Sequence, residues 1–182
     1  MDFWIERMAS PIGTIRLVSD GEALRALDFS DCEERMLQLL RRQCGDFRLT
    51  ECRAGTAARH IKDYFDGDLA APERIAIRME GSAFQRKVWA ALRKIPAGET
   101  SSYGRLAAAI GAPGASRAVG LANGANPIAI VVPCHRVIGA DGSLTGYGGG
   151  LSRKAWLLRH EGGGDLLRHR GQRALGVGST AT

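Results

Sequence analysis

Residues 101–124 read SSYGRLAAAIGAPGASRAVGLANG, a stretch that predicts two short helices joined by a tight turn. The hydroxyl residues Thr100 to Ser102 can cap a first helix over residues 103–110, and Gly111-Ala112-Pro113-Gly114 then breaks the chain. A second helix is expected from about residue 115 to residue 123. The pair matches a helix-turn-helix, whose second helix contacts DNA, although many unrelated helical pairs share this pattern.

A longer helix is expected before this pair. Ser82 and Gln85 form a capping box, in which each side chain binds a free backbone N–H at the helix start. Apolar residues then recur at helical spacing until Ile95-Pro96-Ala97-Gly98 ends the helix. The predicted buried face consists of Phe84, Val88, Ala91, Leu92 and Ile95.

After the pair comes the apolar run Ile128–Val132, followed by Pro133-Cys134-His135-Arg136-Val137 and a glycine-rich loop over residues 146–150. A last helix is expected from Ser152 to Glu161-Gly162. Its predicted buried residues are Ala155, Leu157 and Leu158. The second half of the chain is therefore predicted to be mostly helical.

The first half has the pattern of a mixed α/β domain. Residues 14–18 alternate between apolar and polar, Asp20-Gly21 is a hairpin signal, and residues 24–29 predict the returning strand. Two helices are expected next, one with Asp31 as its N-cap and running through Leu40, the other over residues 56–67. Residues 74–79 alternate again and predict a final strand. No chemical motif is found in this half, which we interpret as a scaffold.

The chain of 182 residues is long enough for two small domains. We expect an N-terminal α/β scaffold domain over residues 1–79 and a C-terminal domain over residues 80–165, followed by a disordered tail over residues 166–182, rich in Gly and Arg. Hydrophobic residues make up 45% and charged residues 24%, as in ordinary globular proteins. No apolar run is long enough to span a membrane and no export signal precedes residue 10, so a cytoplasmic location is expected.

Charge is divided unevenly along the chain. Residues 1–81 carry 12 basic and 15 acidic side chains, a net −3, whereas residues 82–162 carry 10 and 3, a net +7. A basic half of this kind indicates a polyanion partner, although an ordinary solvated face would have the same composition.

The four cysteines are Cys32, Cys44, Cys52 and Cys134. They form no C-x-x-C pair and have no histidine at zinc-ligand spacing, so neither disulfides nor a metal site is expected. Cys134 is followed by His135, which can act as the base that raises its thiolate fraction. Neighbouring residues of an extended segment point apart, so this proton would pass through a water. A cysteine beside valines is also commonly a small buried hydrophobic residue.

Glu161 lies in the last turn of the final predicted helix, where a carboxylate opposes the negative end of the helix dipole. A charge in such an unfavourable position often has a partner, and an imidazole is a suitable one. The alternative is that Glu161 points into water.

Several of these stretches together resemble the O6-alkylguanine-DNA alkyltransferases, in particular the bacterial methylated-DNA–protein-cysteine methyltransferases. The resemblance is dense over residues 82–162 and loose upstream, where it rests on Ser10-Pro11-Ile12-Gly13. The matching stretches are Phe84-Gln85, Val88-Trp89, Ile95–Gly98, Ser102-Tyr103, Arg117–Gly120, Asn126-Pro127, Pro133–Val137, Gly146-Tyr147 and Leu157–Glu161.

The resemblance implies a function and a set of roles. The protein would transfer the alkyl group of O6-alkylguanine, with O4-alkylthymine as a further candidate, irreversibly from duplex DNA to Cys134. His135 would be the water-mediated base, Glu161 would orient it, and Asn126 would brace the turn beneath the site. Tyr103 would hydrogen-bond to the flipped base, and Arg117 would replace that base in the stack. The remaining implied DNA contacts are Ser102, Ala118, Asn123 and Arg136, and the implied base pocket is Val137, Tyr147 and Gly148.

The same resemblance implies a ribonuclease-H-like N-terminal α/β domain, no cofactor and no obligate protein partner. Two departures from the family pattern stand out. The zinc ligands of some larger members are absent, and Gly148 stands where others have a hydroxyl residue, so a roomier pocket is expected. Two alternatives remain: a lesion-recognition protein, against which the retained Cys134 argues, and a cysteine hydrolase, which repeated turnover would reveal.

Overall fold

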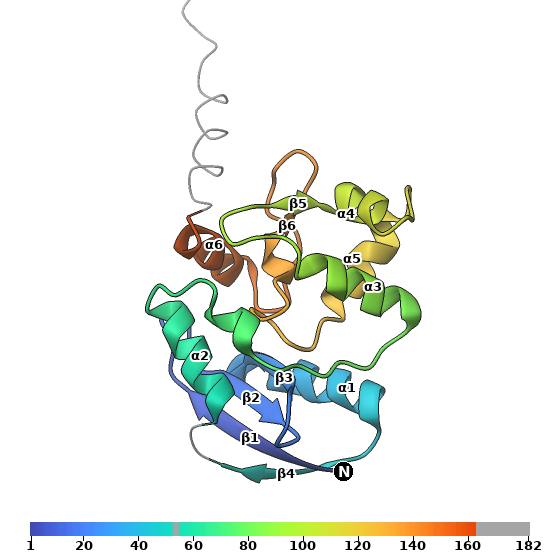
Figure 1. The fold of residues 1–182 in the computed structure, drawn as a ribbon. Helices are drawn as coiled ribbons and strands as arrows, with labels where there is room; N and C mark the ends of the chain where they lie inside the picture. Colours follow the sequence, from blue (N-terminus) through green and yellow to red (C-terminus); the bar gives the residue numbers. More distant parts are fainter. Residues whose placement is uncertain (53–54, 163–182) are drawn as a thin grey trace, which may run out of the picture.

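The computed structural model describes residues 1–52 and 55–162, so the predicted tail over residues 166–182 lies outside the described residues. Figure 1 shows two layers, with strands β1 to β4 and helices α1 and α2 at one end and the remaining helices at the other. The chain is thus a mixed α/β protein with a helical second half.

The strands are β1 (Asp2–Met8), β2 (Ile15–Ser19), β3 (Leu24–Phe29) and β4 (Arg48–Glu51), in the sheet order β3-β2-β1-β4. Among the described strands of this sheet, only β1 and β4 pair in parallel. The predicted hairpin is confirmed: the Asp20 carboxylate accepts hydrogen bonds from the backbone N–H groups of Glu22 and Ala23, and Gly21 has a positive φ of 91°.

Two strands of this sheet were not predicted, and one predicted strand is absent. The alternation of Phe3 and Ile5 with exposed neighbours could have indicated β1, whereas β4 is short and mostly exposed. Residues 74–79 form no strand. A 3₁₀ helix, η2 (Ala71–Arg74), precedes them, and only Ile77 pairs with the sheet, opposite Leu24. The Leu24 N–H donates to the Ala76 carbonyl at 2.8 Å, and the Arg78 N–H donates to the Leu24 carbonyl at 3.0 Å. The chain then continues into the second half.

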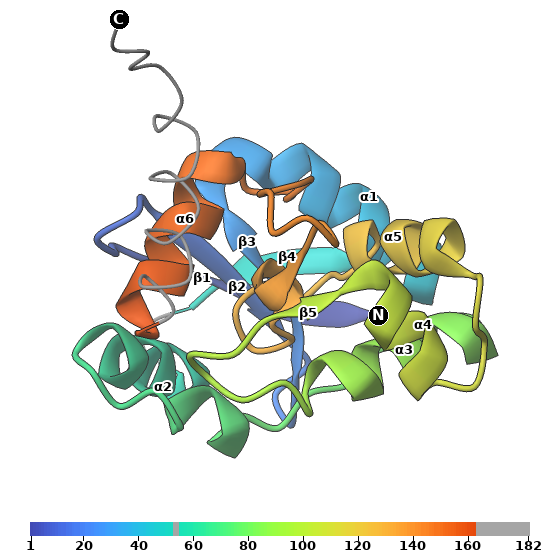
Figure 2. The same ribbon diagram turned by 90° about the horizontal axis from the view of Figure 1, so that it is seen from above.

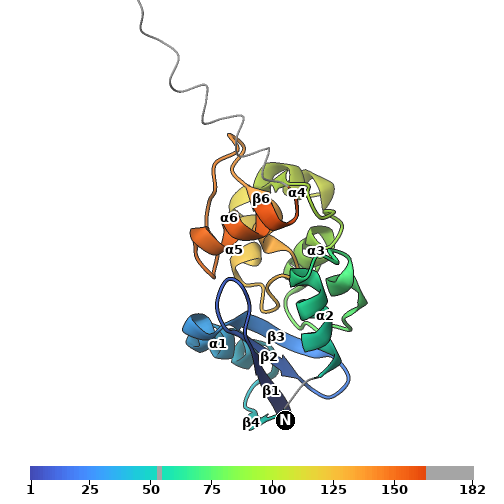
Figure 3. The ribbon, with the colours of Figure 1, turned by 90° about the vertical axis from the view of Figure 1, so that its left-hand side faces the viewer.

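The two predicted helices of this half are α1 (Glu33–Cys44) and α2 (Thr56–Phe65). Asp31 is not the N-cap of α1, because a 3₁₀ turn, η1 (Ser30–Cys32), comes first and the Asp31 carboxylate binds Arg153 at 2.9 Å. Figure 3 shows α1 and α2 on opposite sides of the sheet. Alternating side chains of the strands therefore have a helix to pack against on each face.

The second half contains α3 (Ala83–Leu92), α4 (Tyr103–Ala109), α5 (Ser116–Gly124) and α6 (Leu151–His160), with a short parallel pair, β5 (Ser101–Ser102) and β6 (Val137–Ile138). The capping box is confirmed: the Gln85 N–H donates to Ser82 Oγ at 3.2 Å and the Ser82 N–H to Gln85 Oε1 at 2.9 Å. Helices α3, α4 and α5 pack against one another.

One apolar cluster runs through both halves, from Leu17 and Leu27 of the sheet to Val88 and Val132 of the second half. Backbone hydrogen bonds join the halves as well, since Leu27 N–H donates to the Pro127 carbonyl and Ala129 N–H to the Leu27 carbonyl, both at 2.9 Å. The segment that leads to Cys134 is therefore anchored directly on the sheet. Among the described residues, no helix is long and apolar enough to cross a membrane.

Candidate active site around Cys134

Cys134 lies at the first residue of a 3₁₀ turn, η3 (Cys134–Arg136), and its side chain is almost fully buried. The sequence predicted an extended segment at Cys134, and this prediction is wrong. The chain turns tightly because the Cys134 N–H donates to the Val132 carbonyl at 2.7 Å and the Arg136 N–H to the Pro133 carbonyl at 3.0 Å. Just before it, Ile130 has a positive φ of 69°, a strained conformation for a β-branched residue.

Asn126 holds this turn in place. Its side-chain Nδ2 donates to the Val132 carbonyl at 2.8 Å, and its Oδ1 accepts from the Ile128 N–H at 3.0 Å. Both bonds are buried, so losing either would leave an unpaired polar group in the core. The brace that the resemblance implies thus has a matching geometry, and the strained turn has a physical support.

Burial raises the pKa of the Cys134 thiol. A hydrogen bond with Asn126 and the positive charges of Arg35 and Lys154 act in the opposite direction but do not reverse the shift. The resting thiol is therefore protonated at neutral pH, and a base is needed to turn it into a nucleophile.

His135 follows in the same turn and is completely buried. Its Nε2 lies 2.9 Å from Glu161 Oε1, and its Nδ1 makes no hydrogen bond within the described part of the chain. Burial lowers the pKa of His135, so the imidazole is neutral. With the proton on Nε2, where the carboxylate accepts it, Nδ1 has its lone pair available as a base.

Glu161 is the C-cap of α6 and is 4% exposed, which excludes the alternative that it points into water. Besides His135, it accepts hydrogen bonds from Arg136 Nε and Nη2 and from the Tyr64 hydroxyl, each at 2.8 Å. Burial alone would raise the pKa of this carboxyl, but its hydrogen bonds with His135 and Arg136 and the charge of Arg136 hold that pKa far below its usual range. The carboxylate is therefore permanently charged.

Arg136 was expected to contact DNA, and this is wrong. It is 7% exposed, and besides its two bonds to Glu161 it donates from Nη1 to the Ile95 carbonyl at 2.5 Å. Tyr64, on α2 of the first half, was missed altogether. No local pattern reveals either residue as a partner of Glu161, because both contacts join distant parts of the chain.

A cavity of about 220 Å³ opens beside the Cys134 side chain. Residues from both halves of the chain line it. They are Arg35, Tyr103, Gly120, Asn123, Gly124, Asn126, Ala129, Cys134, Gly146, Tyr147 and Gly148.

Two residues lie elsewhere than the sequence predicted. Asn123 was assigned to the DNA surface, but it is buried in the cavity wall with its Nδ2 3.5 Å from the Cys134 carbonyl. Val137 was assigned to the base pocket, but it is fully buried in β6 and does not line the cavity. Its carbonyl instead accepts a hydrogen bond from Lys154 Nζ at 2.6 Å.

Lys154 is a second residue that the sequence reasoning missed. This buried side chain also donates to the carbonyls of Thr145 at 2.5 Å and Gly146 at 3.5 Å. Burial lowers the pKa of Lys154 to about 8. Its three bonds hold the loop that carries Tyr147, whose own hydroxyl is buried and makes no hydrogen bond within residues 1–52 and 55–162.

The residues expected at the DNA surface otherwise lie together on α4 and α5. Ser102 caps α4 by accepting from the Arg105 N–H, and the Tyr103 hydroxyl accepts from Thr145 Oγ1 at 3.3 Å. Arg117 and Ala118 are exposed on α5. Among residues 82–162, the exposed basic side chains are Arg86, Lys87, Arg93, Lys94, Arg105, Arg117 and Arg159.

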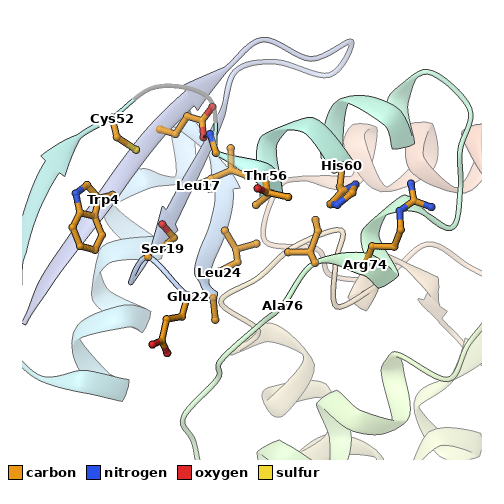
Figure 4. Close-up of a pocket in the computed structure, with 16 residues that line it drawn as sticks. Trp4, Leu17, Ser19, Glu22, Leu24, Cys52, Thr56, His60, Arg74 and Ala76 are labelled. Atoms are coloured by element: carbon orange, nitrogen blue, oxygen red, sulfur yellow. Dashed lines mark hydrogen bonds between the residues drawn. The ribbon is translucent and has the colours of Figure 1, made fainter.

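A larger cavity, of about 500 Å³, lies in the first half between the sheet and α2. Figure 4 shows Cys52 and Trp4 on the side of the strands, and His60 with Arg74 on the side of the helix. Burial raises the pKa of the Cys52 thiol and the nearby Glu6 raises it further, so this thiol is protonated at rest.

Comparisons with known proteins identify the family to which the chain is similar. Residues 83–163 match the family described as "6-O-methylguanine DNA methyltransferase, DNA binding domain". The methylated-DNA–protein-cysteine methyltransferase of Salmonella typhimurium is 51% identical over 161 residues, which cover 86% of this chain and 94% of that protein. A protein of the same name from Mycobacterium tuberculosis is 48% identical over 153 residues, covering 84% and 88%.

Solved structures give the same result. The crystal structure of Mycobacterium tuberculosis OGT in complex with DNA superposes with a TM-score of 0.73 at 44% identity, covering 87% of this chain and 92% of that one. An O6-methylguanine-DNA methyltransferase from Pyrococcus kodakaraensis shares the fold, with a TM-score of 0.70 at 24% identity, covering 88% and 99%.

Glu161→Gln should lower the free energy of unfolding by about 3–5 kcal/mol near pH 7, because it leaves Arg136 buried without a charged partner. The folded-state pKa of Glu161 is depressed, so its charge stabilises the fold above the unfolded-state pKa of about 4.3 and this contribution is lost as the pH falls below that value. Urea unfolding should therefore show the two proteins converging in acid. Glu99→Gln, at an exposed position, is the control and should change stability by less than about 0.5 kcal/mol. A constant gap down to about pH 3 would contradict the role of the charge.

Proposed function

The chain belongs to the methylated-DNA–protein-cysteine methyltransferases, enzymes that repair O6-alkylguanine by direct reversal, and from that premise we propose that Cys134 accepts the alkyl group. The observation that carries this proposal is a buried thiol at the wall of a small cavity, next to a neutral imidazole whose other nitrogen is held by a carboxylate. None of the other cysteines has an imidazole held in this way among the described residues.

The transfer follows from this geometry. His135 Nδ1 takes the proton of the Cys134 thiol through a water, and the imidazolium that forms is stabilised by Glu161. The sulfur then attacks the alkyl carbon, an S–C bond forms, and the bond from that carbon to O6 breaks with its electron pair going to the guanine. Tyr103, on the cavity wall, donates a hydrogen bond to the base as this charge develops. The departing guanine takes up one proton from solvent, which balances the proton that the thiol gave to His135.

The reaction ends with a thioether, which has no leaving group that water or a base could displace at neutral pH. Each molecule is therefore used once, and the product is unmodified guanine. O4-alkylthymine is a further candidate substrate because it presents an alkyl group on the corresponding exocyclic oxygen. No step requires a cofactor.

Double-stranded DNA that carries the lesion is the proposed partner. We assign α4 and α5 to a helix-turn-helix, with α5 as the helix that faces the duplex, because Arg117 and Ala118 are exposed on it. Seven exposed basic side chains of the second half would contact phosphates. Arg117 would fill the space that the flipped nucleotide leaves.

The division of the chain into two domains is also a proposal. We assign residues 1–79 to a ribonuclease-H-like domain and residues 80–165 to the DNA-binding and acceptor domain. In support of the first, the sheet combines antiparallel β1 to β3 with a parallel β4 reached through α1. A substrate in DNA is compatible with the expected cytoplasmic location, which stays a prediction.

Incubation with duplex DNA containing O6-methylguanine should add one methyl group to Cys134 and then stop, because the thioether cannot be released. Intact-protein mass spectrometry with peptide mapping measures this. Cys134→Ala should gain no mass and still bind the same DNA. Product beyond one equivalent per protein would favour the hydrolase alternative, and binding without any transfer by the unaltered protein would favour the lesion-recognition alternative.

His135 and Glu161 should act as one unit. Their separate substitutions, His135→Ala and Glu161→Gln, should each slow transfer, and the double variant should not be additively slower because both remove the same proton acceptor. Raising the pH should partly rescue all three, since a larger fraction of Cys134 is then thiolate without help from a base. Single-turnover rates against pH measure this. Strictly additive losses without rescue would mean that Glu161 serves only to hold the end of α6.

Arg117→Ala should slow repair of duplex DNA much more than reaction with the free O6-methylguanine base, because only the duplex requires base extrusion. The two rates are measured with the same protein preparation. Arg159→Ala, which removes an equal charge from an exposed position on α6, is the control for simple loss of phosphate attraction. Equal slowing of both reactions by Arg117→Ala would refute the wedge.

A further inference from the structure

Arg35 reaches the acceptor cavity from the scaffold half of the chain. It lies on α1, yet its side chain lines the cavity beside Cys134 and Tyr147. Its Nη2 donates to Asp28 Oδ2 at 2.6 Å and its Nη1 to the Gly124 carbonyl at 3.1 Å. The guanidinium is therefore fixed between β3 and the end of α5.

The contact with Gly148 explains why no side chain stands there. A Cβ atom built on Gly148 would overlap the Arg35 guanidinium, with Cζ as its nearest atom and the two terminal nitrogens next. The expected roomier pocket is therefore wrong, because Arg35 fills the space that a side chain at position 148 would take. Gly148 has no positive φ, so a larger residue there would be opposed by the guanidinium, which would have to move, and not by the backbone conformation.

The ion pair between Arg35 and Asp28 keeps the guanidinium at the cavity. Asp28 is 1% exposed, whereas 32% of the Arg35 side chain remains exposed. Arg35 Nε is buried and makes no hydrogen bond with any described residue, so one donor of the guanidinium is not used by the fold. A buried carboxylate that tethers a partly exposed guanidinium presents positive charge at one place.

We propose that Arg35 is a residue of the lesion pocket whose cation stabilises the negative charge that passes from the Cys134 sulfur to the departing purine. The inference rests on the proposed transfer to Cys134. Charge starts on the sulfur and ends on the guanine as the S–C bond forms and the C–O6 bond breaks, and both ends of this path lie in the cavity that Arg35 lines. The N-terminal half would then supply part of the reaction site.

The test uses the double variant Asp28→Asn/Arg35→Gln, which removes both charges, leaves the net charge of the protein unchanged and strands no buried carboxylate. Single-turnover alkylation should slow by roughly tenfold or more with duplex DNA and with the free O6-methylguanine base alike. Asp28→Asn alone keeps the cation but removes its tether, so it should slow alkylation less than the double variant does. Thermal unfolding of each variant reports whether the fold is kept.

Two outcomes would overturn the proposal. An unchanged rate in a folded double variant would mean that the cation has no part in the reaction. Slowing with duplex DNA only would make Arg35 a phosphate contact. A failure of the underlying function is seen separately, because Cys134→Ala would then still be alkylated in the same assay.

A second measurement does not depend on the stability of that double variant. Gly148→Ala should displace the guanidinium and slow alkylation of the otherwise unaltered protein, but have no added effect when Arg35 is already Gln. In a folded chain, equal slowing in both backgrounds would show that Gly148 and Arg35 act independently, which contradicts the proposal. Arg42→Gln, at an exposed site on the same helix, should leave both rates unchanged.

Discussion

The buried carboxylate of Glu161 is the interaction on which the site depends. Removing this charge from water has a large free-energy cost, and four donors offset it: one from His135, two from Arg136 and one from Tyr64. These donors come from the turn that carries Cys134 and from α2 of the other half. A single carboxylate at the end of α6 thereby fixes the orientation of the base and the docking of the two halves.

The first half of the chain is consequently more than a scaffold. It contributes Tyr64 to the Glu161 cluster, Leu27 to the backbone bonds that anchor the segment before Cys134, and Arg35 to the cavity. Figure 2 shows α2 and α6 on the same side of the molecule, where His160 Nε2 donates to the Tyr64 carbonyl at 2.7 Å. A shared apolar core makes these contacts rigid, so small changes in one half alter the geometry of the other.

Structure that depends on interactions between residues close in sequence could be predicted, whereas contacts between distant residues could not. The capping box at Ser82, the helices α3 to α6 and the β2–β3 hairpin are set by local patterns, and all were predicted to within a few residues. Cys134 and its neighbours were identified through the resemblance. Arg136 and Arg35 could not be placed correctly, because an arginine next to a histidine, or on an amphipathic helix, is normally solvent-exposed. Only the folded chain shows what surrounds them.

The electrostatics of the site suit a protein that reacts once. Arg136 already neutralises Glu161, so the carboxylate does not draw a proton onto His135, and burial keeps both the imidazole and the Cys134 thiol uncharged at rest. Oxidation of cysteine depends on thiolate character and exposure, and the resting Cys134 has little of either. In the transfer proposed above, the thiolate forms only when the proton moves to His135, where Glu161 stabilises the resulting charge. The same burial that raises the thiol pKa would then preserve the proposed acceptor until a lesion occupies the cavity.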